Sequence, residues 1–174
     1  EDNLKNRFNY KINGIDYDKK FVFSEMGFNI EPTEIGAAFG LVQLTKLKNN
    51  IKIRQKNFNL HYKFFKNLNH LFHLPKIEKS HSTGMLAFPI IIKNNVKFSR
   101  KNFQIYLEKN KIQTRPIFTG NILYHPGFKN FKYKLVNKKY NNAHLISRNG
   151  ILLGLHQGLS FHDIKFMHKK ILDF

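Results

Sequence analysis

Two polar side chains in this sequence stand where a phosphate group could be recognised. Asn29 ends a glycine–phenylalanine–asparagine run, just before a helix predicted to open near Pro32. A side-chain amide can donate to a phosphate oxygen, and the amino end of a helix favours anions. Arg115 precedes Pro116 at the end of a short predicted strand, and its guanidinium can present two parallel donors to a phosphate or carboxylate. Both positions suit recognition of a phosphate or a phosphorylated sugar.

Each of these side chains also has a simpler structural explanation. Asn is common in turns because its side chain bonds to nearby backbone, so Asn29 alone does not require a ligand. Arg115 could instead pair with an acid such as Glu25 or Glu108. The residues by themselves leave both alternatives open.

Other familiar patterns of catalysis or metal binding are missing from the sequence. The histidines are scattered, and the spacing of His156, His162 and His168 does not bring successive members onto one face of a helix. The absence of Cys excludes disulfides and thiolate metal sites, and it agrees with a cytoplasmic setting. Glycine-rich phosphate loops and nucleophile elbows are also lacking. We therefore predict no metal site.

The chain of 174 residues has a formal net charge of +19, a balance typical of proteins that bind nucleic acid. Most of the cations are dispersed lysines, whereas a surface that reads phosphates and bases would use more Arg. Lys, Asn, Ile and Phe are also the residues that A/T-rich codons encode. We favour compositional drift and predict no specific nucleic acid partner. A basic, non-catalytic binding module for nucleic acid or anionic surfaces is the alternative function.

The ends and the apolar stretches limit where the protein acts. No stretch approaches the ~20 apolar residues that a membrane-spanning helix needs, so we predict no membrane partner. The polar opening lacks the apolar segment of a signal peptide, which favours a cytoplasmic location. Because the chain opens on Glu1, in sequence typical of the middle of a protein, we expect a fragment that lacks its amino-terminal part.

Apolar periodicity predicts an α/β fold with helices packed on a small sheet. We expect a loop over residues 1–20, and then two helices, or one long bent helix, from Pro32 to Leu68. Ile35, Phe39 and Val42 form an apolar stripe on the first of these. The remaining expected elements are strands over 85–93, 112–118 and 151–155, and helices capped by Ser99 and Ser160.

Several segments together resemble the carboxy-terminal part of the DegT/DnrJ/StrS family, whose members are PLP-dependent enzymes that act on nucleotide-linked keto sugars. The glycine–aromatic–Asn turn is at 27–29, the Ala-Ala-x-Gly-x-x-Gln-Leu helix pattern at 37–44, and the following Arg is Arg54. The stretch 150–160 is similar to the last strand and the start of the last helix. The loop 115–121 resembles the 4-keto-6-deoxy-sugar 3-dehydratase branch, where His typically replaces the Schiff-base Lys.

The resemblance implies a fold-type-I transferase architecture. Residues 1–48 would be the carboxy-terminal edge of the large PLP-binding domain, and residues 49–174 the small carboxy-terminal α/β domain. The full-length parent would be a cytoplasmic homodimer with pyridoxal 5'-phosphate, acting on a nucleotide-sugar substrate in cell-surface polysaccharide or deoxysugar biosynthesis. Whether it is an aminotransferase or a 3-dehydratase stays open, as do the sugar and the nucleotide.

The resemblance also implies roles for individual residues. Asn29 would reach the PLP phosphate of the neighbouring subunit, and Arg115 and Asn121 would line the sugar-nucleotide site. The family's Schiff-base Lys or His precedes Glu1, so no catalytic residue is expected in this chain. In aminotransferases of the family an Arg often follows two residues after the Asn, whereas this chain has Glu31.

Overall fold

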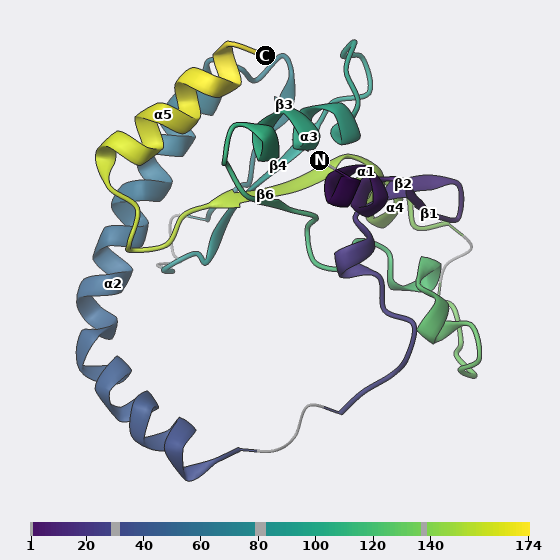
Figure 1. Cartoon of the computed structure of the whole chain (residues 1–174), viewed down its shortest axis with the longest axis horizontal. Coiled ribbons are helices and arrows are strands. Elements are labelled where there is room, and N and C mark those ends of the chain that lie inside the picture. Colours follow the sequence, from purple (N-terminus) through teal and green to yellow (C-terminus); the bar gives the residue numbers. More distant parts are fainter. Residues whose placement is uncertain (1, 29–31, 79–82, 137–138) are drawn as a thin grey trace.

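A four-stranded antiparallel sheet organises the chain, with strand order β3–β4–β6–β5 (Figure 1). The strands are β3 (Phe72–His73), β4 (Ala87–Ile92), β6 (Gly150–Gly154) and β5 (Thr114–Arg115). The computed structural model describes residues 2–28, 32–78, 83–136 and 139–174. β4 and β6 form the centre of the sheet, because they pair from Ala87 opposite Gly154 to Ile91 opposite Gly150.

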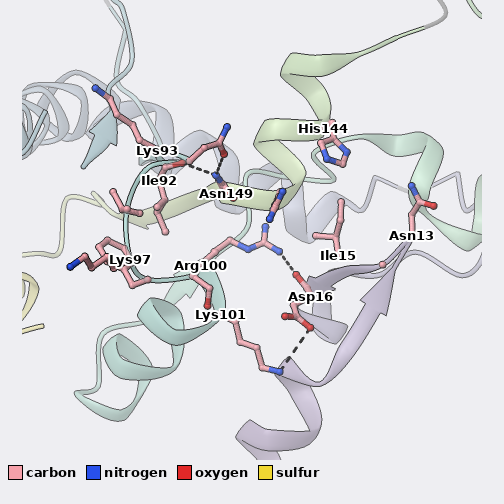
Figure 2. Close-up of a pocket in the computed structure, with 16 residues that line it drawn as sticks. Asn13, Ile15, Asp16, Ile92, Lys93, Lys97, Arg100, Lys101, His144 and Asn149 are labelled. Carbon is pink, nitrogen blue, oxygen red and sulfur yellow. Dashed lines mark hydrogen bonds and ion pairs between the residues drawn. The ribbon is translucent and has the colours of Figure 1, made fainter. Parts of the chain in front are cut away.

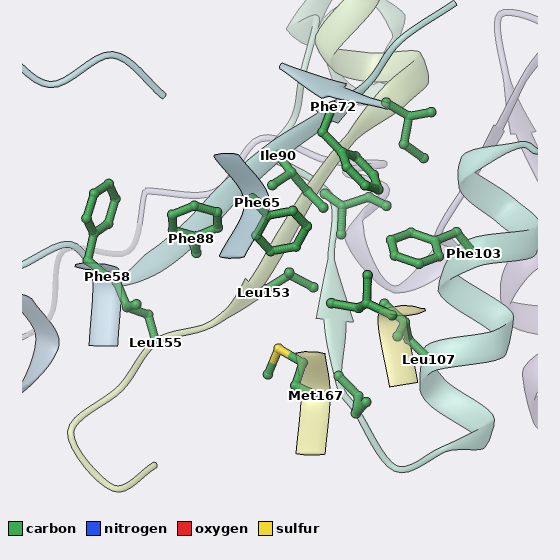
Figure 3. Close-up of a cluster of buried hydrophobic side chains, with 14 residues drawn as sticks. Phe58, Phe65, Phe72, Phe88, Ile90, Phe103, Leu107, Leu153, Leu155 and Met167 are labelled. Atoms are coloured by element: carbon green, nitrogen blue, oxygen red, sulfur yellow. The ribbon is translucent and has the colours of Figure 1, made fainter. Parts of the chain in front are cut away.

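One face of this sheet carries the hydrophobic core. Alternate residues of β4 are buried, so Phe88 and Ile90 lie beneath the helices opposite Leu153 and Ile151 of β6. The helices that cover this face are the second half of α2 (Glu34–Lys66), α3 (Arg100–Lys109) and α5 (Phe161–Leu172). Phe65 of α2 is fully buried and stacks on Phe88, with ring centroids 5.4 Å apart (Figure 3). The predicted α/β architecture is therefore confirmed.

The first part of the chain is ordered into short elements, and the prediction of a loop over residues 1–20 is wrong. The elements are α1 (Asp2–Phe8), β1 (Tyr10–Ile12), β2 (Ile15–Tyr17) and the 3-10 turn η1 (Lys19–Phe21). Asn13 and Gly14 have φ angles of 50° and 75° and connect β1 to β2. An Asn-Gly pair between strands is a strong hairpin signal, and the prediction overlooked it.

Helix α2 is one continuous helix rather than two. It starts at Glu34, two residues later than predicted, because Thr33 caps it: the Thr33 hydroxyl accepts a hydrogen bond from the Gly36 N–H at 3.1 Å. Its buried residues, Asn57, Phe58, His61 and Phe65, all belong to its second half. Figure 1 shows the first half extending away from the sheet. Ile35 and Phe39 of this half are exposed.

The predicted caps of the later helices are confirmed. Ser99 accepts a hydrogen bond from Asn102 N–H at 3.2 Å, and Ser160 forms a capping box with Asp163. The sequence missed α4 (Asn141–Asn149), the 3-10 turns η2 (Ile122–Tyr124) and η3 (Pro126–Phe128), and β3. In the described part of the chain, no helix is long and apolar enough to span a bilayer.

Candidate substrate-anion site

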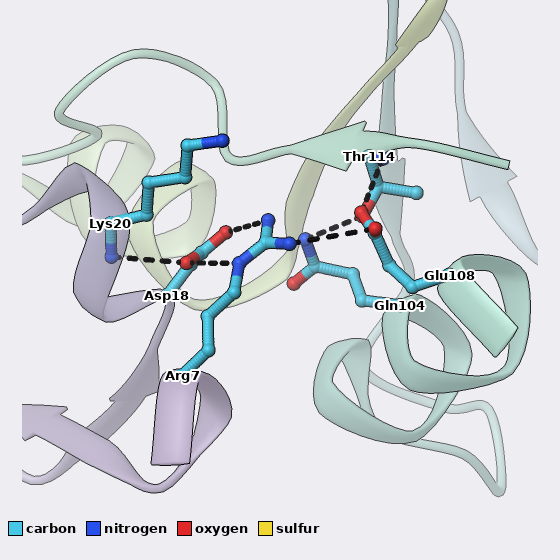
Figure 4. Close-up of polar contacts among 6 residues, drawn as sticks. All are labelled: Arg7, Asp18, Lys20, Gln104, Glu108 and Thr114. Carbon is cyan, nitrogen blue, oxygen red and sulfur yellow. Dashed lines mark hydrogen bonds and ion pairs between the residues drawn. The ribbon is translucent and has the colours of Figure 1, made fainter. Parts of the chain in front are cut away.

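The site begins with β5, a strand of only two residues that is held by buried side chains. Thr114 is fully buried, and the Glu108 carboxylate accepts hydrogen bonds from its backbone N–H at 2.6 Å and from its hydroxyl at 3.1 Å (Figure 4). Gln104 donates to the same hydroxyl at 3.1 Å. Since consecutive strand residues point to opposite faces, burying Thr114 directs Arg115 outward.

Arg115 is exposed, and its guanidinium lies 5.9 Å from the centre of the Phe21 ring. Among the described residues, no ion pair within 4.0 Å joins Arg115 to a carboxylate. Glu108, an acid that the sequence offered as a partner, instead binds Thr114 and lies 3.5 Å from the Arg7 guanidinium. The cation is thus available for an anion supplied from outside the described chain.

A cavity of about 200 Å³ adjoins this guanidinium. Arg115, Gln113 and His156 supply its polar side chains, and the rest of its lining is Leu86, Ala87, Leu152, Leu153, Gly154 and Leu155. The His156 Nδ1 accepts a hydrogen bond from the Gly158 N–H at 3.2 Å, so the neutral ring carries its proton on Nε2. The described side chains around this cavity include no lysine and no acid. Such a lining can donate hydrogen bonds to an anionic or hydroxyl-rich ligand.

The loop after Arg115 is fastened to the segment that leads to Asn29. The Gly127 N–H donates to the Phe23 carbonyl at 3.0 Å, and the Phe23 N–H donates to His125 Nδ1 at 3.4 Å. His125 is fully buried and bonds the Thr119 carbonyl at 2.8 Å. A Cβ at Gly127 would lie 3.2 Å from the Phe23 carbonyl oxygen, a tighter approach than most side chains make. Folding therefore brings Phe23, six residues before Asn29, next to the loop that follows Arg115.

The three residues predicted to bind ligands have different settings. Arg115 lines the cavity. Asn121 is buried, its side-chain oxygen caps η2 by accepting from the Leu123 N–H at 3.1 Å, and its backbone N–H donates to the Ser147 hydroxyl. It is not among the residues that line the Arg115 cavity. Asn29 lies outside the described residues. The sequence analysis missed Gln113 and His156, although their positions beside predicted strands were a usable signal.

A larger cavity of about 580 Å³ lies between the β1–β2 hairpin, α3 and α4 (Figure 2). Its buried cation, Arg100, already donates to the Asp16 and Ser147 carbonyls. Lys101 donates to the Asn9 side chain at 3.0 Å and lies 3.9 Å from the Asp16 carboxylate. These partners indicate that the two cations hold α3 against the β1–β2 hairpin and α4, which is a structural role. No group of three or more metal-ligating side chains occurs within the described ranges.

The sequence profile of the DegT/DnrJ/EryC1/StrS aminotransferase family matches residues 2–171, which is nearly the whole chain. The chain belongs to this family. A similar protein is the GDP-4-keto-6-deoxy-D-mannose 3-dehydratase of Escherichia coli O55:H7, 30% identical over 166 residues that make up 91% of this chain and 41% of that protein. The lipopolysaccharide biosynthesis protein RfbH of Salmonella typhimurium is 27% identical over 158 residues, 91% of this chain and 36% of RfbH.

Solved structures of family members agree with the fold of this DegT/DnrJ/EryC1/StrS chain. The E. coli GDP-4-keto-6-deoxy-D-mannose-3-dehydratase with bound hydrated PLP superposes with a TM-score of 0.71 and 30% identity, covering 87% of this chain and 38% of that one. The predictions of the family and of its fold-type-I architecture are confirmed. The chain spans only 36% to 41% of the length of the two relatives above.

The family implies PLP as the cofactor, and the residues around Arg115 show which kind of contact this part of the chain can offer it. Arg115 has no acidic partner within the described chain and fits an anionic group. None of the described residues around its cavity is a lysine, so this cavity offers no amine for a covalent bond to the cofactor. The described residues therefore fit a non-covalent supporting role.

Proposed function

We propose that this chain works as the carboxy-terminal part of a PLP-dependent sugar-nucleotide enzyme, with Arg115 binding an anionic group of the substrate. The full-length protein, here a polypeptide of the relatives' length that contains this chain, would be an aminotransferase or 3-dehydratase for nucleotide-linked keto-deoxy sugars. The observation that supports this most is the Arg115 guanidinium, which no described carboxylate neutralises, at the edge of an otherwise largely apolar cavity where Gln113 and His156 can donate hydrogen bonds.

Each part of the site has a task in this proposal. Arg115 binds a phosphate or carboxylate, while Gln113 and the His156 Nε2–H donate to sugar hydroxyl or carbonyl oxygens. The apolar lining limits the access of water. PLP, when bound, supplies an electron sink for carbanion chemistry at the sugar. Asn121, as the cap of η2, holds the loop at the margin of the substrate site.

The cofactor contact and the assembly follow from the resemblance. Asn29 is proposed to donate its amide to the PLP phosphate of the neighbouring subunit in a cytoplasmic homodimer with two-fold symmetry. The fastening of Phe23 to the 116–128 loop supports this, because it keeps the segment that leads to Asn29 next to the substrate side. The boundary between the large and small domains is proposed near residue 48, within α2.

Steady-state kinetics of the full-length protein test the proposal. Arg115→Ala should raise KM for a nucleotide-linked 4-keto-6-deoxy sugar about tenfold or more, because a charge-assisted bond contributes about 1.5–3 kcal/mol. Arg148→Ala, which removes an exposed guanidinium from α4, is the matched control and should leave KM unchanged. An Arg115→Ala enzyme with normal KM but lowered stability would contradict the substrate role.

In the same protein, Asn29→Ala should weaken PLP retention, and unchanged cofactor affinity would refute the phosphate contact.

A further inference from the structure

The hydrogen bonds around Thr114 join β5 to the end of the helix before it. After α3 ends at Lys109, the chain reverses through Lys111, whose φ is 63°, and Ile112 N–H bonds back to the Leu107 carbonyl at 2.9 Å. This reversal brings Thr114 back to the Glu108 side chain in the last turn of α3, where both Thr114 donors are bound. A single carboxylate oxygen therefore fixes the start of the strand.

Main-chain pairing holds this strand weakly. Only Thr114 and Arg115 pair with β6, opposite Leu153 and Leu152. Pro116 follows and has no N–H to extend the ladder. Because a slip of one residue would turn Arg115 to the inner face, the register needs further contacts, and the Glu108–Thr114 bonds provide them.

The same network also places the aromatic ring beside Arg115. Arg7 lies between two acids: its Nε donates to Asp18 at 2.8 Å, and its Nη1 is 3.5 Å from Glu108 (Figure 4). The hydrogen bond to Asp18 raises the pKa of Arg7, so the bridge stays charged. Asp18 in turn accepts from the Lys20 N–H at 3.1 Å and caps η1, the turn that ends at Phe21.

We infer that Glu108 and Thr114 are positioning residues that act through Arg115 and set the place of its guanidinium for substrate binding. Glu108 fixes the strand that carries Arg115, and through Arg7 and Asp18 it fixes the turn that carries Phe21. The bonds to Thr114 and Arg7 also keep the Glu108 carboxylate from neutralising Arg115. This inference rests on the proposed substrate role of Arg115.

A double-mutant cycle in the full-length protein tests it, with KM and kcat for a nucleotide-linked 4-keto-6-deoxy sugar as the readout. Thr114→Val keeps the side-chain volume but removes the hydroxyl, and it should raise KM about three- to tenfold with little change in kcat. Thr114→Ser, which restores the hydroxyl, should return KM to near the starting value. In an Arg115→Ala background, Thr114→Val should have no further effect on KM.

The outcomes separate this inference from the proposed function. If Thr114→Val raises KM equally with and without Arg115, or has no effect while Arg115→Ala does, the positioning role is refuted and the proposed function stands. If Arg115→Ala itself leaves KM unchanged, the proposed function fails, and the inference fails with it. Should Thr114→Val not fold, as thermal unfolding would report, Glu108→Gln takes its place in the cycle, since it keeps the side-chain size and removes the charge that faces Arg7.

Discussion

The two halves of α2 share one helix and differ in what covers them. In the first half, Ile35 is 85% exposed and Phe39 66% exposed, while in the second half Phe65 is fully buried under α5 and the sheet. Both halves carry apolar residues at helical spacing, and the stripe of Ile35, Phe39 and Val42 was predicted for the first half. Apart from its immediate neighbours on the helix, no described residue lies within 4 Å of the position that a Cβ at Gly40, in the first half, would take.

This difference separates the small core from a surface that needs a partner. The second half completes the core of the 49–174 region, whereas the first half presents a run of exposed apolar residues: Ile35, Phe39, Leu41, Val42, Leu44 and Leu47. At about 3.6 residues per turn these side chains lie around most of the helix circumference, and a large exposed apolar surface of this kind marks an interface. We expect the rest of the full-length protein to cover this surface, because the chain spans only 41% of the length of its E. coli relative.

The largest effect is expected from deleting a ring in the buried half of α2, with a ring deletion in the exposed half as the comparison. Phe65→Ala should lower the free energy of unfolding of the 174-residue chain by about 3–5 kcal/mol, because it opens a cavity among Phe72, Phe88 and His168. Phe39→Ala in the same chain should change it by less than about 0.5 kcal/mol. Urea unfolding measures both, and similar losses for the two variants would show that the halves do not differ.

An intermediate effect is expected from pH, and it comes from His61 in the buried half of α2 and from His168 of α5, which contacts it. His61 Nε2–H donates to the Gly154 carbonyl at 3.1 Å, and its Nδ1 then accepts from His168 Nε2 at 2.9 Å, so the His61 ring is neutral. Burial lowers the pKa of His61 and of His168, and for His168 the nearby His61 and Lys165 add to this. The unfolded chain therefore binds more protons than the folded chain below the ordinary histidine pKa of 6.5.

Stability should accordingly fall as pH drops through 6.5 towards the lowered folded values, by at most about 1.4 kcal/mol per pH unit for each ring. Denaturant unfolding between pH 7.5 and pH 5, buffer values chosen around that ~6.5 midpoint, measures the slope. His168→Gln should flatten it, while His162→Gln, which changes an exposed ring on the same helix, is the matched control. A slope that His168→Gln leaves untouched would assign the pH dependence to other groups.

The smallest effect concerns the exposed half and appears in solubility rather than in unfolding. The double substitution Phe39→Ser and Leu44→Ser should raise the soluble concentration of the 174-residue chain several-fold, because it replaces two exposed apolar side chains of α2 by polar ones. Sedimentation after concentration measures this. Lys46→Ser with Lys48→Ser, on the same helix, is the control. An equal gain in solubility from this control would show that the exposed apolar side chains are not the cause.

The sequence predicted most of what depends on neighbouring residues. Ser99 and Ser160 were recognised as caps because a cap involves residues three positions apart. The hairpin at Asn13 and Gly14 was equally local, and it was missed because the polar composition of the first twenty residues outweighed the turn signal. The 112–118 segment proved to be a strand of two residues, since Pro116 and the positive φ of Phe118, 47°, end the pairing early.

The sequence by itself determined the family and the helix caps, since each follows from motifs or from spacing along the chain. Only the tertiary structure decided which partners bind each acid. Glu108 accepts from Thr114 and lies 3.5 Å from Arg7, and Asp18 accepts from Arg7. It alone placed Phe21 beside Arg115 and Phe23 against Gly127. Arg7 and Glu108, Phe21 and Arg115, and Phe23 and Gly127 are each far apart in sequence. A hydrogen bond or ring contact is set by distance and angle in space, which residue spacing does not encode.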